Sequence, residues 1–189
     1  MTLSALGIFS AAGAGGGVAL SDYEFIESTI LTGTQSSFTF SSLGTYSSTY
    51  KHLQIRAVVR SDRANTDDTL LVRVNGDTGT NYRFHLLLAD GSGVFSTGNT
   101  DNKMELGRTA GGSNASGIYG VNVLDVLDAY STTKNKTFRA SAGLNRASSP
   151  YVFLNSGARF NTEAISSITL FPIGSFVSGS RFSIYGIKG

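Results

Sequence analysis

The sequence predicts an all-β fold, an antiparallel β-sandwich of about ten short strands with a jelly-roll-like arrangement. Three observations support this prediction. Runs rich in Val, Ile, Thr, Phe and Tyr recur between clusters of Gly, Ser and Asn, and several runs alternate apolar with polar residues. No sustained helical periodicity is present. The 12 Phe and 8 Tyr residues supply large side chains for a core between two sheets.

The segment at 1–20 differs from the rest of the chain, and we expect it to be an extended, apolar, Gly/Ala-rich segment ahead of a single sandwich domain at 21–189. It has no charged side chain, so it lacks the basic start of a secretory signal. Glycines interrupt it before it reaches the about 20 apolar residues of a membrane helix, so no membrane insertion is expected.

We expect this segment to act as an anchor that folds against a partner protein, with the glycines behind it as a hinge. A disordered end and a first strand of the domain are the alternatives. The anchor residues are Leu3, Leu6, Ile8 and Phe9, which are unfavourable side chains to leave in water.

The first part of the domain contains four predicted strands, at 25–31, 36–40, 53–60 and 70–74. The third strand alternates most clearly, and we expect Leu53, Ile55, Ala57 and Val59 to point into the core.

The dipeptide Asn75-Gly76 follows the fourth strand and predicts a hairpin with a type I′ turn, because both central positions of that turn need a positive φ. The return strand is expected at 82–88. One face of this strand is expected to carry Tyr82, Phe84, Leu86 and Leu88.

The region at 89–117 is rich in Gly, Ser, Asn and Thr, and it predicts one strand, at 103–106. The apolar residues of 121–130 fit a helix or a strand, but their β-branched valines favour a strand. The remaining strands are expected at 118–127, 136–143, 151–160, 165–171 and 182–188.

Composition excludes several classes of function. The chain has no cysteine, which excludes disulfides, thiol nucleophiles and cysteine metal sites. Its formal net charge is +2 and its basic residues are scattered, so we expect no nucleic-acid partner.

Neither a catalytic group nor a cofactor is expected. His52 directly precedes a predicted strand, His85 lies within one, and no nucleophile elbow precedes a helix. Acidic residues near the predicted hairpin could ligate calcium, but turn chemistry explains them better, so no metal is expected.

Several segments together carry a resemblance to a known family. They lie at 28–31, 38–41, 50–53, 59–63, 71–82, 130–136, 165–170 and 176–188, and one of them contains Asn75-Gly76-Asp77-Thr78-Gly79. In their order and spacing they resemble a family of jelly-roll-like structural proteins from the virions of tailed, often marine, bacteriophages. The resemblance spans 23–189 and is weakest at 89–117. The resemblance implies that the protein is a virion component, and it indicates much less strongly where in the virion the protein lies.

These observations together predict a non-enzymatic virion structural protein that is assembled in the host cytoplasm. We expect a tail-fibre or appendage subunit, a homotrimer, attached to other virion proteins of the tail, neck or capsid through the segment at 1–20. One alternative is a capsid decoration protein that cements neighbouring capsomers. Another is a carbohydrate-binding module that attaches to a host-surface glycan.

Two groups of side chains are candidates for contacts with partners. The first group contains tyrosines at predicted strand ends, which contact a glycan or else pack at the edge of the core: Tyr46, Tyr50, Tyr119, Tyr130 and Tyr151. The second group forms a charged cluster, for intersubunit ion pairs or for a solvated strand edge: Arg56, Arg60, Asp62 and Arg63.

Overall fold

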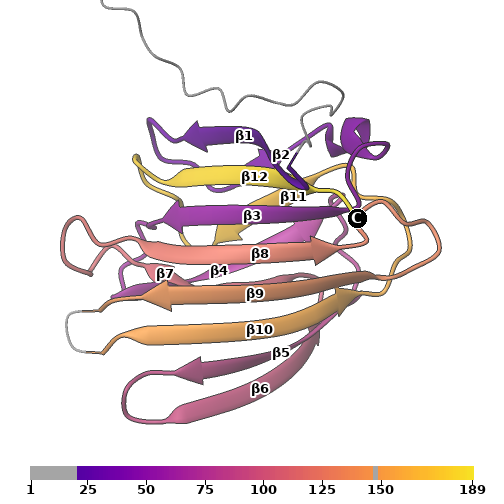
Figure 1. Ribbon diagram of the computed structural model, residues 1–189. Helices are drawn as coiled ribbons and strands as arrows, with labels where there is room; N and C mark the ends of the chain where they lie inside the picture. Colours follow the sequence, from indigo (N-terminus) through magenta and orange to yellow (C-terminus); the bar gives the residue numbers. More distant parts are fainter. Residues whose placement is uncertain (1–20, 147–148) are drawn as a thin grey trace, which may run out of the picture.

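Two antiparallel sheets, one of eight strands and one of four, face each other in the computed structural model, which describes residues 21–146 and 149–189 (Figure 1). The strands are β1 (Tyr23–Ile30), β2 (Phe38–Phe40), β3 (His52–Val59), β4 (Asp67–Val74), β5 (Tyr82–Ala89), β6 (Val94–Asp101), β7 (Met104–Ala110), β8 (Gly120–Leu127), β9 (Lys136–Leu144), β10 (Tyr151–Arg159), β11 (Ile168–Pro172) and β12 (Arg181–Ile187). A short 3-10 turn, η1 (Leu43–Tyr46), lies between β2 and β3. No helix in these two ranges is long and apolar enough to cross a membrane. The predicted all-β sandwich is confirmed.

Eight of these strands have the connectivity of a jelly roll. In chain order they are β1, β2, β3, β4, β7, β8, β11 and β12, and they form the neighbour orders β1-β12-β3-β8 and β2-β11-β4-β7. The first of the eight therefore pairs with the last, and the second with the seventh, which is the pairing of two Greek keys wound together. The prediction of a jelly-roll-like fold is therefore confirmed by the order in which the strands pair, as well as by the presence of two sheets.

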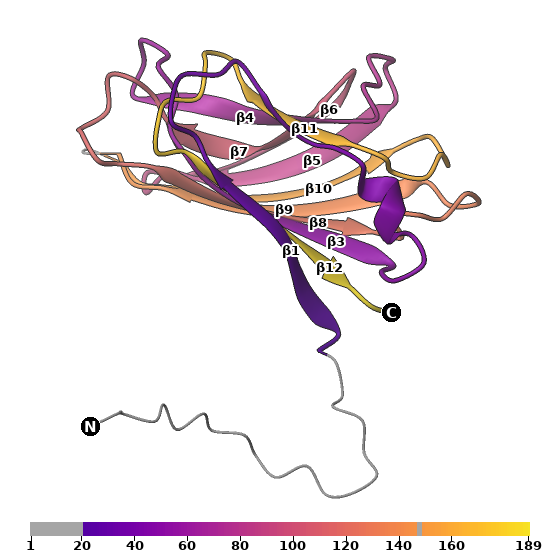
Figure 2. The ribbon, with the colours of Figure 1, turned by 90° about the horizontal axis from the view of Figure 1, so that it is seen from above.

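Two hairpins are added to this jelly roll. β5–β6 lies between β4 and β7 in the chain, and β9–β10 lies between β8 and β11. Both hairpins extend the large sheet beyond β8 in the order β9-β10-β5-β6 (Figure 1). Figure 2 shows the large sheet curving around the small one. The added strands therefore widen one sheet without widening the other.

The core lies between the inner faces of the two sheets. The predicted inward residues of β3, from Leu53 to Val59, are at most 1% exposed, which confirms their alternation. Aromatic rings continue the core at one side, where Phe38 stacks on Phe182 with ring centroids 4.4 Å apart. Alternation along β3 and β8 also places every second side chain on the outer face of the large sheet.

The predicted hairpin at Asn75-Gly76 is wrong, although its turn forms. Asn75 and Gly76 have φ values of 54° and 66°, and the Asp77 amide donates to the Val74 carbonyl at 3.0 Å, as a type I′ turn requires. However, β4 belongs to the small sheet and β5 to the large one. Both edges of β4 are already occupied, by β11 and β7, so the chain leaves the turn and crosses to the other sheet.

The sequence did not predict β6, which lies within the weak region at 89–117. Seven of its eight residues are exposed, so neither face shows the apolar alternation that marks a half-buried strand. Its pairing with β5 along its whole length is what makes it a strand. The neighbouring β7 begins near its predicted start and continues to Ala110.

Candidate functional site

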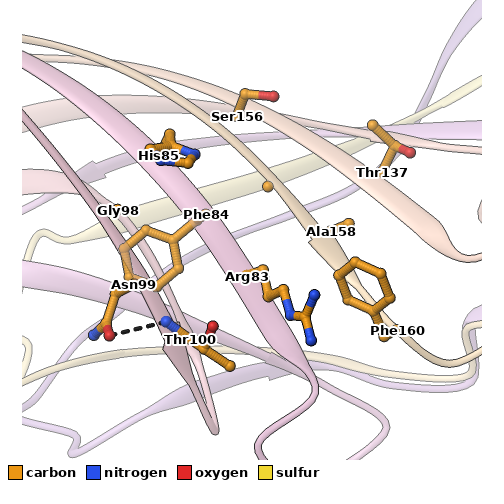
Figure 3. A pocket seen from close by; sticks show the side chains of 11 residues that line it. Arg83, Phe84, His85, Gly98, Asn99, Thr100, Thr137, Ser156, Ala158 and Phe160 are labelled. Atoms are coloured by element: carbon orange, nitrogen blue, oxygen red, sulfur yellow. Dashed lines mark hydrogen bonds between the residues drawn. The ribbon is translucent and has the colours of Figure 1, made fainter.

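A shallow groove lies on the outer face of the four added strands. It has a volume of about 780 Å³, and its walls come from β5, β6, β9 and β10 (Figure 3). The lining residues are Arg83, Phe84, His85, Gly98, Asn99, Thr100, Thr137, Ser156, Gly157, Ala158 and Phe160. The eight jelly-roll strands contribute nothing to this lining, so the groove is built by the two inserted hairpins.

One end of the groove is formed by a cation and an aromatic ring. The Arg83 guanidinium lies 4.6 Å from the centre of the Phe160 ring, close enough for a cation–π contact. Phe160 follows the last residue of β10 and is 47% exposed, so its ring is available to a ligand or partner. The pair combines a flat apolar surface with the donors of a guanidinium.

The centre of the groove depends on the pair of His85 and Gly98, which face each other across β5 and β6. A β-carbon at Gly98 would collide with the His85 imidazole, so glycine allows the ring to lie across β6. Nearby, the Thr100 amide donates to Asn99 Oδ1 at 2.9 Å (Figure 3). The groove therefore offers a ligand an imidazole, a side-chain amide and hydroxyl groups as hydrogen-bonding partners.

A second hollow of about 430 Å³ adjoins the groove and shares His85 and Ser156 with it. Leu87 and Leu154 line it, with the Arg139 side chain alongside. The two hollows together form a surface that is polar at one end and apolar at the other. Their lining contains arginine and histidine but no Asp or Glu. Such a surface can bind a neutral or anionic partner, and it lacks the two facing carboxylates of glycoside hydrolysis.

Three of the five predicted tyrosines meet outside this groove, at the end of the sandwich where β3 begins and β8 ends. Tyr46, Tyr50 and Tyr130 gather around η1, where a cavity of about 280 Å³ is partly lined by Tyr50 and Tyr130. The hydroxyls of Tyr50 and Tyr130 already have partners, since Tyr50 donates to Glu24 Oε2 at 2.7 Å and Tyr130 donates to the Leu43 carbonyl at 2.9 Å. Burial raises the pKa of Tyr130 to about 12.

The other two tyrosines lie at the far end of the strands. The Tyr119 hydroxyl donates to the Ser178 carbonyl at 3.0 Å. The Tyr151 ring lies beneath the Arg146 guanidinium, 3.9 Å from its centre. The structure therefore divides the five tyrosines between two ends of the sandwich, and four of them have contacts within the chain that fix the ring or the hydroxyl.

The predicted charged cluster is also divided. The Arg60 guanidinium donates to four backbone carbonyls in the loop between β7 and β8. Asp62 accepts from the Ser175 amide, and Arg63 pairs with the buried Asp68 at 3.3 Å. Arg56 alone projects from the outer face, where it lies 4.8 Å from the Tyr185 ring centre. Three of the four residues thus organise loops of their own chain.

Other predicted features have structural partners too. His52 Nδ1 accepts a hydrogen bond from the Asp128 amide at 2.8 Å. Asp77, near the Asn-Gly turn, accepts from Arg159 Nε at 2.8 Å. In the part of the chain that the structure describes, no three His, Asp or Glu side chains gather as metal ligands would. The anchor residues Leu3, Leu6, Ile8 and Phe9 lie outside the described residues.

Sequence reasoning missed the groove, because its residues come from four strands and include the unpredicted β6. The one local signal was His85 on the polar face of its strand. No protein family, no curated protein and no solved structure matches this chain.

Proposed function

We propose that this chain is a non-enzymatic structural protein of a tailed-phage virion, an appendage or tail-fibre subunit that works within a larger assembly. The resemblance of its ordered segments to such proteins supports the class. The observation that carries the proposal is the outer face of the large sheet, which exposes far more apolar side chains than the rest of the described surface.

Among residues 21–146 and 149–189, twelve large apolar side chains are at least 40% exposed, and ten of them belong to this face. Nine lie in its strands and Phe160 follows directly after one. The ten are Phe25, Ile30, Val58, Leu87, Val94, Val121, Leu127, Val152, Leu154 and Phe160. Contiguous apolar surface of this kind marks interaction sites in soluble proteins.

Strand register shows that six of these side chains lie in two adjacent rows of the face. One row of cross-strand neighbours runs from β3 to β6 and consists of Val58, Val121, Gly143, Val152, Ala89 and Val94. The next row on the same face contains Val123, Leu154 and Leu87. Covering the exposed half of one such side chain contributes on the order of 1 kcal/mol, so a few rows suffice for stable assembly.

A polar row crosses the same face, one step nearer the groove. It contains Gln54, Asp125, Arg139, Ser156 and His85. Asp125 accepts from Gln54 at 2.7 Å and from Arg139 at 2.7 Å, which holds the row in one arrangement. Apolar rows give affinity and a polar row gives register, the combination that a specific subunit contact needs.

The groove supports a second candidate, a host-surface carbohydrate-binding role. Its exposed Phe160 ring, Arg83, His85 and Asn99 are groups with which proteins orient a neutral polar ligand. A glycan array with the purified chain tests this role, using Arg83→Ala as the variant that should lose binding. Binding that persists in Arg83→Ala, or no binding by the unaltered chain, would contradict it.

The test of the main proposal is the copy number of the chain in purified phage particles, measured by quantitative mass spectrometry against the major capsid protein. An appendage subunit is expected at a small multiple of the tail symmetry. A number close to that of the capsid protein would show a decoration protein instead, and absence from the particle would refute both.

A matched pair of variants connects this test to the outer face. Val121→Lys places a charge in the apolar row and should abolish incorporation into particles. Ile173→Lys places the same charge at a residue that is 58% exposed but lies off this face, and it should incorporate normally. Equal incorporation of the two variants would show that the outer face is not the docking surface.

A further inference from the structure

The described chain has four edge strands, and three of them are protected against pairing with another chain. These are β1 and β6 in the large sheet and β2 and β7 in the small one. Proteins protect edges with short strands, bulges, charges or covering groups, because an open edge adds strands from other chains.

The protection differs at each of the three edges. β1 has a bulge between Phe25 and Glu27 and exposes the Glu27 carboxylate. β2 is three residues long. β7 lies over the large sheet, where the side-chain amides of Asn122 and Asn155 donate to its Arg108 and Glu105 carbonyls.

β6 has none of these devices. It is eight residues long, contains no Lys, Arg or Pro, and pairs with β5 over its whole length without a bulge. Its only charge is Asp101, at its end. Alternate backbone N–H and C=O groups point away from β5, and no other described strand pairs with them. Figure 1 shows β6 as the last strand of the large sheet.

We propose that β6 pairs with β6 of a second copy of this chain, antiparallel and about a two-fold axis beside Thr97, which lies opposite its counterpart in the second copy. Two-fold symmetry joins an edge to itself and makes one continuous sheet through both copies. An axis perpendicular to the sheet keeps outer face beside outer face, so the apolar row that ends at Val94 meets the partner's sheet.

Charge determines the orientation and favours the second copy as the occupant. In an antiparallel pair the two Asp101 carboxylates lie at opposite ends of the joined strands. A parallel pair would bring them side by side, which is unfavourable. The rest of β6 is uncharged, so two copies meet without repulsion.

The pairing has a consequence for symmetry. An edge joined to itself gives an even number of chains, whereas the homotrimer expected from the sequence needs two different surfaces in contact. This inference does not depend on the virion assignment, because it rests on the β6 edge alone.

The test is the mass of the purified full-length chain across a range of concentrations, by sedimentation equilibrium. The chain is expected to reach twice its mass. Thr97→Lys places two like charges beside the axis and should weaken self-association about fivefold. The matched control is Thr39→Lys, an exposed threonine on the short edge strand β2, which should associate normally.

A mixture gives a stricter test. Thr97→Lys and Thr97→Asp should each associate poorly alone and associate with each other when mixed. Hydrogen exchange should show alternate β6 amides protected in the dimer and unprotected after dilution. A monomer at every concentration, a trimer, or a dimer that tolerates Thr97→Lys would overturn the proposal. Protected β6 amides in a monomer would instead show that another segment of the same chain covers this edge.

Discussion

Replacing Asp77 with asparagine should cost this protein about 3 kcal/mol of unfolding free energy, because it breaks a buried ion pair from one side. Arg159 is 2% exposed and sits at the end of β10, where its Nε donates to Asp77 Oδ2 at 2.8 Å. Its second partner, Glu163, lies 3.1 Å from Nη2 and is 57% exposed, so it compensates weakly. Arg159 Nη1 has no hydrogen-bond partner among the described residues.

Asp77 also holds the connection that carries the chain from β4 to β5. It accepts from the Gly79 amide at 2.9 Å and from the Asn81 side-chain amide at 3.0 Å. The side-chain carbonyl introduced by Asp77→Asn remains a neutral acceptor for these amides, so the loss comes chiefly from the uncompensated guanidinium.

Urea unfolding at neutral pH measures the change, and a double-mutant cycle isolates the pair. Arg159→Met removes the buried charge, so Asp77→Asn should cost much less in that background than in the unaltered chain. If Asp77→Asn costs less than about 1 kcal/mol, or costs the same in both backgrounds, the ion pair does not hold this corner of the fold.

The same pair gives a pH dependence with a defined sign. Burial acts to raise the pKa of Asp77, but hydrogen bonds from Arg159, Asn81 and Gly79 outweigh it and lower that pKa below its ordinary value. A lowered carboxyl pKa contributes stability that is present above the unfolded pKa and is lost as pH falls through the folded pKa. Acid unfolding should therefore be less steep in Asp77→Asn than in the unaltered chain.

Three further predictions concern other parts of the sandwich. Because the Tyr130 pKa is raised from 10.0 to about 12, stability should fall as pH rises from 10 to 12, and Tyr130→Phe should reduce that fall in urea titrations; an unchanged slope would contradict the assignment. Gly186→Ala should cost about 1–3 kcal/mol because its β-carbon would overlap the buried Tyr50 ring, whereas Gly143→Ala, 3.6 Å from Val121 Cγ1, should change stability by less than about 0.5 kcal/mol. Similar melting temperatures for the two glycine variants would refute this packing argument. Deleting 181–189 should abolish cooperative unfolding by circular dichroism, because β12 lies between β1 and β3 and buries Phe182 and Ile184; a cooperative transition in the truncated chain would show that the sheet closes without it.

The two inserted hairpins give the protein its distinctive surface. The eight jelly-roll strands alone would form two sheets of four. Adding β9-β10-β5-β6 to one sheet extends the apolar rows of the outer face and builds the groove. It also leaves β6 as an open edge strand of that sheet. The β6 pair therefore depends on these four strands, whereas the assembly surface also includes apolar side chains from β1, β3 and β8.

Local sequence patterns determined the class of fold and most of the strands. Leu53, Ile55, Ala57 and Val59 alternate with polar residues, and alternation alone places them on one face. The valines of β8 favoured a strand over a helix for the same kind of local reason, their restricted χ1 angle. Even the type I′ turn at Asn75-Gly76 was predictable, since positive φ is a property of those two residues.

Which strands become neighbours was decided only by the tertiary structure. Asn75-Gly76 specifies a turn, but whether β5 returns beside β4 depends on β7 and β11, which occupy both edges of β4 and lie far away in the chain. β6 has no periodic signal because its stability comes from backbone pairing with β5, and backbone groups are the same for every residue type. The outer apolar rows and the groove join residues from β3, β8, β9, β10, β5 and β6, so they exist only once the register is set. Turn and strand preferences are properties of individual residues and can be predicted from the sequence. The choice of neighbouring strands depends instead on which strands compete for the same sheet edges.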